Sequence, residues 1–132
     1  MSEDSRRESE PSERGEDMTL LLDPEAIEQI RVVERAIGRS DLFTELVAKL
    51  EGSLNGFGPA WLELIARGDT AGATRAAHTL KGTCRQLGAA ALGTLFADIE
   101  RAAKAGDYAE AKRRFDAGES LISESLEALK RA

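Results

Sequence analysis

An apolar stripe with the period of an α-helix runs from Phe43 to Ile65 without a change of phase. A helix of this length must cover its apolar face with other apolar surface. The stripe therefore predicts a domain built of helices packed on helices. Its members recur mostly every three or four residues, and they are Phe43, Leu46, Val47, Leu50, Leu54, Phe57, Trp61, Leu64 and Ile65.

The composition supports the same fold class. The chain has 132 residues, of which 42% are hydrophobic, which is enough for one domain with a single core. Leu and Ala predominate, β-branched residues are sparse and proline occurs three times, a composition that favours helices. The sequence contains no strand pattern and no internal repeat. We therefore expect an all-α fold.

The segment Asn55-Gly56-Phe57-Gly58-Pro59 interrupts the long stripe. A proline inside a helix loses one backbone hydrogen bond and clashes with the carbonyl four residues back, here that of Asn55. The segment therefore either breaks the element into two helices or kinks one long helix. The unbroken phase of the stripe favours the kink.

Start and stop signals divide the rest of the chain into four further helices. Asp23-Pro24-Glu25 begins the first, which carries Ile27, Ile30, Val33 and Ile37 and ends at Gly38. Gly68-Asp69, Gly88 and Gly106-Asp107 separate the later helices, expected from about Thr70 to Leu87, from about Ala89 to Ala103, and from Gly106-Asp107 onward through Leu129. Such short connections predict an antiparallel up-and-down helical bundle.

The chain begins with an acidic segment of different character. Residues 1–17 contain seven acidic and three basic residues and no aliphatic or aromatic side chain after Met1. Such a segment buries too little apolar surface to fold, so we expect a disordered acidic tail over residues 1–18 and a single helical domain over residues 19–132. The net charge of −6 gives no sign of nucleic acid binding.

Two further features bear on where the chain works. It has no signal-peptide pattern and no apolar run long enough for a transmembrane helix. Cys84 is the only cysteine, so no intramolecular disulfide can form. We therefore expect a cytoplasmic protein without membrane association, in which Cys84 is a small core residue.

His78 is the only histidine, and a helical wheel places it on a polar face. At about 100° per residue, the apolar residues of its helix lie on the opposite side. The other residues of this outward face lie within about 60° of His78 on the wheel. They are Ala71, Thr74, Arg75, Lys81, Gly82 and Arg85. The sequence therefore predicts an exposed imidazole, which is a nucleophile when neutral.

The neighbours of His78 suggest more than an ordinary solvated face. Lys81 and Arg85 follow at the third and seventh positions, where cations would stabilise a phosphoryl group attached to the ring. Gly82 lies one turn after His78, and a glycine inside a helix costs about 1 kcal/mol relative to alanine. Its missing side chain opens an approach to the imidazole for a partner protein. The alternative is a solvated face that contains Lys and Arg.

The segment Ala77-His78-Thr79-Leu80-Lys81-Gly82, with Leu87-Gly88-Ala89 shortly after it, resembles the histidine-containing phosphotransfer (HPt) domain. The likeness extends over roughly residues 20–130. It implies a four-helix up-and-down bundle with an additional N-terminal helix and the histidine exposed in mid-helix. Where the family often has small residues after the glycine, this chain has Thr83-Cys84-Arg85-Gln86, a difference that bears on partner preference rather than on chemistry.

The resemblance also implies roles for single residues. His78 would be phosphorylated, Lys81 would stabilise the phosphoryl group, and Gly82 would admit the partner, with Arg85, Thr74 and Arg75 on the same docking surface. Glu100 matches a position at which a polar side chain holds the imidazole. The competing interpretation of Glu100 is a surface pair with Lys104, worth about 0.5 kcal/mol.

The function implied is that of a phosphorelay carrier rather than an independent enzyme. The carrier would accept a phosphoryl group from an aspartate of a response-regulator receiver domain, supplied by a hybrid histidine kinase, and pass it to another receiver. The chain has no nucleotide-binding motif, so we expect no cofactor in it, and Mg²⁺ on the partner receiver. We expect a monomer.

Three other functions are possible for a helical bundle with one exposed histidine. A metal-binding bundle would need several ligands, whereas the chain has one histidine with Cys84 on the opposite face. A hydrolase would need a converging pocket, which a convex helix does not offer. The strongest rival is an interaction module that binds receivers or kinases without being phosphorylated, and the intact His78-x-x-Lys81-Gly82 pattern disfavours it.

Overall fold

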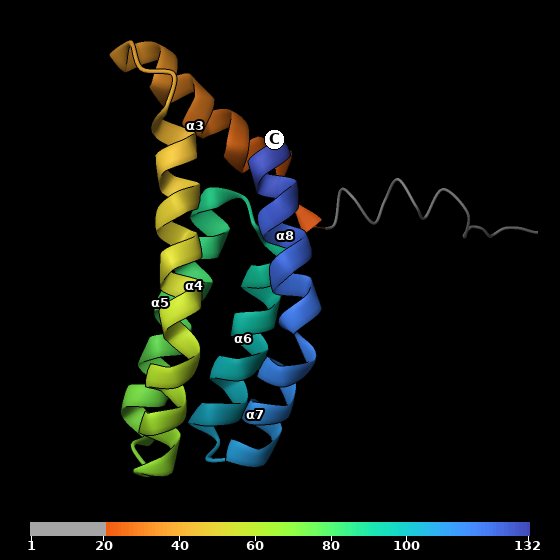
Figure 1. Cartoon of the computed structure of the whole chain (residues 1–132). Helices are drawn as coiled ribbons and strands as arrows, with labels where there is room; N and C mark the ends of the chain where they lie inside the picture. Colours follow the sequence, from red (N-terminus) through yellow and green to blue (C-terminus); the bar gives the residue numbers. More distant parts are fainter. Residues whose placement is uncertain (1–20) are drawn as a thin grey trace, which may run out of the picture.

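The computed structural model describes residues 21–132, and this part of the chain contains helices and no strand (Figure 1). The predicted acidic tail, residues 1–18, lies outside the described residues. No helix of the described part is long and apolar enough to cross a membrane. The helices are α3 (Pro24–Ile37), α4 (Leu42–Ala66), α5 (Thr70–Leu87), α6 (Ala90–Lys104), α7 (Tyr108–Ala117) and α8 (Glu119–Arg131).

The predicted helix starts and stops are found in the structure. The Asp69 carboxylate accepts a hydrogen bond from the backbone N–H of Gly72 at 2.8 Å and so caps α5, the helix that carries His78. Asp23 and Asp107 cap α3 and α7 in the same way. Gly88 ends α5 with φ of 89°, a left-handed conformation that glycine adopts without strain.

Helix α4 is one continuous helix through Pro59, so the element does not break into two helices there. Six side chains of the stripe are buried, whereas Pro59 itself is exposed. The proline therefore lies away from the core, and the buried contacts before and after it hold the two halves of the helix together.

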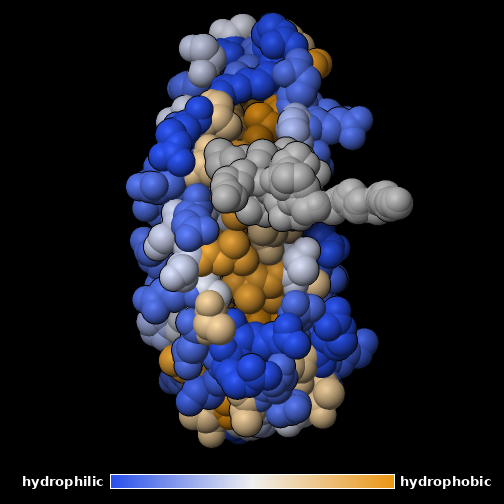
Figure 2. All heavy atoms as spheres, turned by 90° about the vertical axis from the view of Figure 1, so that its right-hand side faces the viewer, coloured by the Kyte–Doolittle hydropathy of each residue, from blue (hydrophilic) through white to orange (hydrophobic). Residues whose placement is uncertain are grey.

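The helices pack around a core of aromatic and aliphatic side chains. Helix α5 packs against α4 and α6, α6 also packs against α7 and α8, and α8 contacts α4, while α3 lies across one end against α4 and α5 (Figure 1). Trp61 and Phe96 are the largest fully buried side chains. Phe57 stacks on Trp61 at 5.6 Å between ring centroids and meets Phe96 edge-on at 5.2 Å. On the face that carries α8, hydrophobic residues form a central band between hydrophilic ones (Figure 2).

The prediction of a single last helix was wrong. The structure has two helices, α7 and α8, with Gly118 between them. A Cβ atom at Gly118 would lie 2.6 Å from Leu95 Cδ2, so the backbone there packs directly against the Leu95 side chain of α6, which would have to shift to admit a larger residue. The sequence signal was the seven-residue step between Phe115 and Ile122, which contains this glycine.

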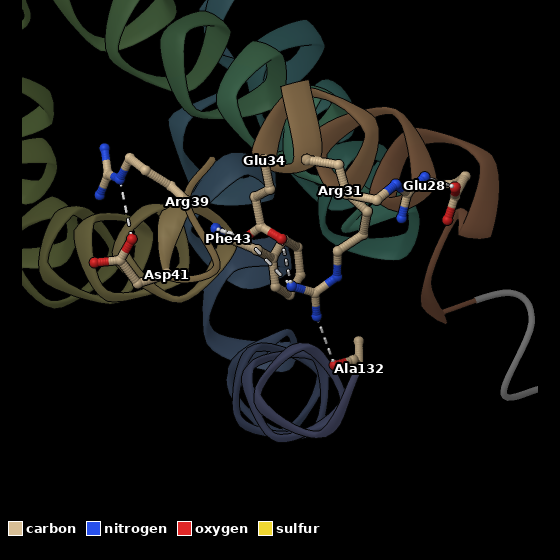
Figure 3. Close-up of polar contacts among 8 residues, drawn as sticks. Glu28, Arg31, Glu34, Arg39, Asp41, Phe43 and Ala132 are labelled. Carbon is tan, nitrogen blue, oxygen red and sulfur yellow. Dashed lines mark hydrogen bonds and ion pairs between the residues drawn. The ribbon is translucent and has the colours of Figure 1, made fainter. Parts of the chain in front are cut away.

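The apolar residues of α3 are only partly buried. Ile27 and Ile30 pack against the core, but Val33 and Ile37 are 47% and 54% exposed. The buried residue of this half of the helix is Glu34. Its carboxylate accepts hydrogen bonds from the Phe43 backbone N–H at 2.7 Å and from Arg31 at 3.1 Å (Figure 3). Glu34 thus satisfies an N–H group in the first turn of α4, which would otherwise lack a partner.

Arg31 joins this contact to the last helix. Its guanidinium lies 4.7 Å from the centroid of the Phe43 ring and donates a hydrogen bond to the backbone oxygen of Ala132 at 3.0 Å (Figure 3). One arginine therefore connects α3, the start of α4 and the end of α8. We call Arg31, Glu34 and Phe43 the α3 anchor.

We predict that the α3 anchor weakens in acid. The Phe43 N–H and then Arg31 lower the pKa of Glu34 below its ordinary value of 4.5, against the opposing effect of burial. A carboxylate with a depressed folded pKa stabilises the fold above its unfolded pKa, and this stabilisation is lost as the pH falls through the folded value. The wild-type chain will therefore lose more stability below about pH 4.5 than Glu34→Gln does.

Urea unfolding followed by circular dichroism at neutral and acidic pH measures this difference. Glu28→Gln is the matched control, because Glu28 lies on the same helix but is exposed, and its one ion pair within residues 21–132 is with exposed Arg35. Equal acid sensitivity of the wild type and Glu34→Gln would show that the Glu34 carboxylate does not stabilise the start of α4.

Candidate functional site

His78 projects outward from the middle of α5. Its side chain is 63% exposed, whereas Ala77, Leu80 and Cys84 of the same helix are buried. The helical wheel thus predicted the orientation of the histidine correctly. Burial raises the pKa of the Cys84 thiol to about 12, so that Cys84 is an unreactive core residue, as predicted.

Glu100 of α6 lies against the imidazole. His78 Nδ1 and Glu100 Oε2 are 3.0 Å apart, and the Glu100 side chain is only 19% exposed. Its other oxygen, Oε1, lies 2.8 Å from Lys81 Nζ. The carboxylate is therefore shared between the histidine and the lysine. Within residues 21–132 no ion pair joins Glu100 to Lys104, the competing partner considered from sequence.

The charge on Glu100 determines which ring nitrogen of His78 is free. Lys81, and after it His78, hold the pKa of Glu100 below its ordinary value of 4.5, although partial burial opposes them. Glu100 is therefore ionised near neutral pH, and an ionised carboxylate only accepts hydrogen bonds. In the neutral imidazole the hydrogen therefore lies on Nδ1, which donates it to Glu100, and the lone pair of Nε2 is free.

Lys81 lies one turn after His78 and reaches toward α6, where its ammonium group binds the carboxylate that also contacts the imidazole. Its side chain is 21% exposed. His78, Lys81 and Glu100 thus form one cluster across two helices. We call it the His78 cluster.

Gly82 leaves open space next to the imidazole. A Cβ atom built at this position meets no atom within 4 Å. Gly82 therefore has no packing partner that would explain the absence of a side chain. The surface one turn beyond His78 is bare, as the sequence predicted.

The other predicted docking residues differ in how far they reach the surface. Arg75 and Arg85 are exposed on α5. Thr74 is half-buried, and its hydroxyl oxygen is buried without a hydrogen-bond partner in the described part of the chain. The accessible part of Thr74 therefore does not include its hydroxyl oxygen.

The family model of the Hpt domain matches residues 24–132. This chain belongs to the Hpt domain family. Hpt domains carry phosphoryl groups on histidine in two-component signalling, and they are phosphotransfer carriers rather than kinases. Searches of curated proteins and of solved structures found no match.

The match covers every helix from α3 to α8, so the α3 anchor and the His78 cluster both lie inside the Hpt domain. Sequence reasoning missed one residue beside the exposed face of α5, Gly93 of α6, which is buried against Arg85. The signal was present, because a glycine in the interior of a predicted helix calls for a packing reason.

No group of three or more His, Cys, Asp or Glu side chains suited to a metal ion occurs between residues 21 and 132.

Proposed function

We propose that this Hpt domain is a phosphorelay carrier that accepts a phosphoryl group from a receiver-domain aspartate on Nε2 of His78 and passes it to a second receiver. The supporting observation is that the imidazole is exposed and is anchored through Nδ1 to Glu100, with open space over Gly82. A nucleophile fixed in this way on a convex surface suits a partner that brings its own active site.

The transfer step follows from this arrangement. The lone pair of Nε2 forms a bond to phosphorus while the bond from phosphorus to the aspartate oxygen breaks, and the aspartate leaves as a carboxylate. The imidazole ring becomes positively charged and keeps its hydrogen on Nδ1. The negative charge of the Glu100 carboxylate, which accepts that hydrogen bond, stabilises the positive ring. The return step reverses these changes, with a carboxylate of the second receiver attacking phosphorus.

Little covalent chemistry is left for the rest of the domain. In phosphoryl transfer, charge spreads over the equatorial oxygens, so positioning and electrostatic stabilisation dominate. Glu100 supplies the positioning of the ring. Lys81 supplies a cation within the His78 cluster for the oxygens of the incoming group.

The partner would complete the site. We propose that receiver domains dock over Gly82, Arg75, Arg85 and the accessible edge of Thr74, and that Mg²⁺ is held by the receiver. A hybrid histidine kinase would load the first receiver, and one copy of the chain would act alone.

For the arrangement of the helices we propose an antiparallel four-helix bundle of α4, α5, α6 and the α7–α8 pair, with α3 as the additional helix. The short connections after α4, α5 and α6 support it.

Incubation with a phosphorylated receiver tests the function. The expected product is a label on the chain that is labile in acid and stable in alkali, as a phosphoramidate is. A non-phosphorylated interaction module would bind receivers without acquiring label. Binding without label across a panel of purified phosphorylated receivers would contradict the carrier function and favour the interaction module.

We predict that Glu100→Gln slows transfer about tenfold, the lower end of what loss of an orienting partner costs. The glutamine oxygen can still accept a hydrogen bond from Nδ1, but it carries no negative charge to stabilise the positively charged ring. Glu100→Ala removes both effects and should slow transfer further. Single-turnover transfer from a phosphorylated receiver measures the rates. Equal rates for the wild type and Glu100→Ala would leave Glu100 with no part in the reaction.

Lys81→Ala should also slow transfer about tenfold, because a charge-assisted contact to the phosphoryl oxygens is lost. Its thermal unfolding should change little, since a partly exposed ion pair contributes about 0–1 kcal/mol. Lys104→Ala is the matched control, because Lys104 is an exposed lysine one turn beyond Glu100. If both variants transfer at the wild-type rate, Lys81 does not contact the phosphoryl group.

A further inference from the structure

Gly93 of α6 provides a seat for the side chain of Arg85. A Cβ atom at Gly93 would lie 2.8 Å from Arg85 Cγ and 3.3 Å from Arg85 Nε. The aliphatic part of the arginine therefore lies directly on the α6 backbone, in space that any other residue at position 93 would occupy. Glycine inside a helix destabilises it relative to alanine, and the arginine is the group that uses the space.

This seat holds the arginine on the same face as the histidine. Arg85 lies seven positions after His78, which is two turns of helix, so its Cα is about 10 Å further along the same side of α5. The residue is exposed. Within residues 21–132 no carboxylate forms an ion pair with its guanidinium, whereas the Lys81 ammonium is already bound to Glu100.

Seating the stem changes what the arginine offers a partner. A free arginine loses rotamer entropy when it forms a contact, and a stem already held in place loses less. Arg75 is also exposed on this face, but among the described glycines none has the Arg75 side chain as a nearest neighbour. Of these two arginines, Arg85 is therefore the better prepared to bind a carboxylate in a fixed position.

We propose that Arg85, seated on Gly93, is a specificity-determining contact that selects receiver domains with an acidic side chain beyond the phosphoryl-transfer point, toward the C-terminal end of α5. The proposal rests on the proposed function and adds the charge and position of the partner group. Gly93 acts through Arg85 and is a positioning residue.

A double-mutant cycle on the full chain tests the proposal. Arg85→Ala, Gly93→Ala and the double variant are compared with the wild type in transfer from a panel of purified phosphorylated receivers. For the preferred receiver, Arg85→Ala should raise KM, the half-saturating receiver concentration in single-turnover transfer, about tenfold. The maximal transfer rate, kcat, should change little, and KM should depend less on salt concentration. Gly93→Ala should raise KM as well, because its methyl group displaces the arginine stem.

The coupling between the two positions is the decisive result. In the Arg85→Ala background, Gly93→Ala should have no further effect, because no stem is left to displace. Arg75→Ala removes an exposed arginine from the same helix and should change KM less than Arg85→Ala. An unchanged KM in Arg85→Ala would overturn the proposal, and so would an equal effect of Gly93→Ala with and without the arginine.

Chemical phosphorylation separates this inference from the function on which it rests. Phosphoramidate is a small phosphoryl donor that needs no docking, so every variant should accept label from it on His78. If receivers label the wild type and Arg85→Ala with equal KM, the specificity contact is wrong and the carrier function stands. If no receiver labels the wild type, the carrier function is overturned together with the contact.

Discussion

His78→Gln will accept no phosphoryl group from a phosphorylated receiver, while its thermal unfolding will match that of the wild type within the error of the measurement. Glutamine can accept a hydrogen bond but offers no nucleophilic ring nitrogen. The His78 side chain is largely exposed, and substitutions at such positions change stability by about 0.5 kcal/mol or less. Acid-labile label and circular dichroism melts measure the two properties on the same samples.

The control for this variant must keep the helix and the surface charge. Thr79→Gln serves, because Thr79 is the exposed neighbour of His78 on α5. It should be labelled like the wild type. Label on His78→Gln equal to that of the wild type would place the accepting group elsewhere in the chain.

The second large effect is expected at Gly82. Gly82→Leu should slow transfer at least about 100-fold, because misplacing the reacting groups by about 1 Å costs this much. The bare surface beside His78 would then carry a side chain in the path of the receiver. The helix itself should gain stability, since Gly82 has no neighbours to clash with and leucine is a better helix former by about 0.8 kcal/mol.

Two variants separate steric blocking from a change in the helix. Gly82→Ala strengthens the helix to a similar extent with far less bulk, so its transfer should be much closer to that of the wild type. Gly52→Leu places the same side chain at an exposed glycine of α4 that also has no atom within 4 Å, and its transfer should be unchanged. Normal transfer by Gly82→Leu would mean that the receiver does not approach across this glycine.

The helix ends and the exposed face of α5 could be predicted because their causes are local in the chain. Asp69 caps the helix that it precedes, and Gly88 ends it through its own backbone conformation. The outward position of His78 follows from the period of the helix and from the buried residues around Leu80 and Cys84. Each of these features depends on residues within a few turns of one another.

The features that the sequence did not predict depend on contacts between distant segments. Glu34 is buried because its carboxylate binds an N–H group at the start of the next helix, nine residues away. At Gly118, between α7 and α8, the backbone packs directly against the Leu95 side chain of α6. Within the site, the sequence suggested Glu100 through resemblance to a family, with a surface pair with Lys104 as the alternative. Its sharing between His78 and Lys81 depends on the packing of α6 against α5.

The central claim is that Nε2 of His78 receives the phosphoryl group while Glu100 holds the hydrogen on Nδ1. Nuclear magnetic resonance of ¹⁵N-histidine-labelled protein after reaction with a phosphorylated receiver tests it most directly, because His78 is the only histidine. The expected result is one new coupling between phosphorus and Nε2, with Nδ1 still carrying its hydrogen. A coupling to Nδ1, or an unchanged histidine spectrum after the receiver has lost its phosphoryl group, would contradict the claim.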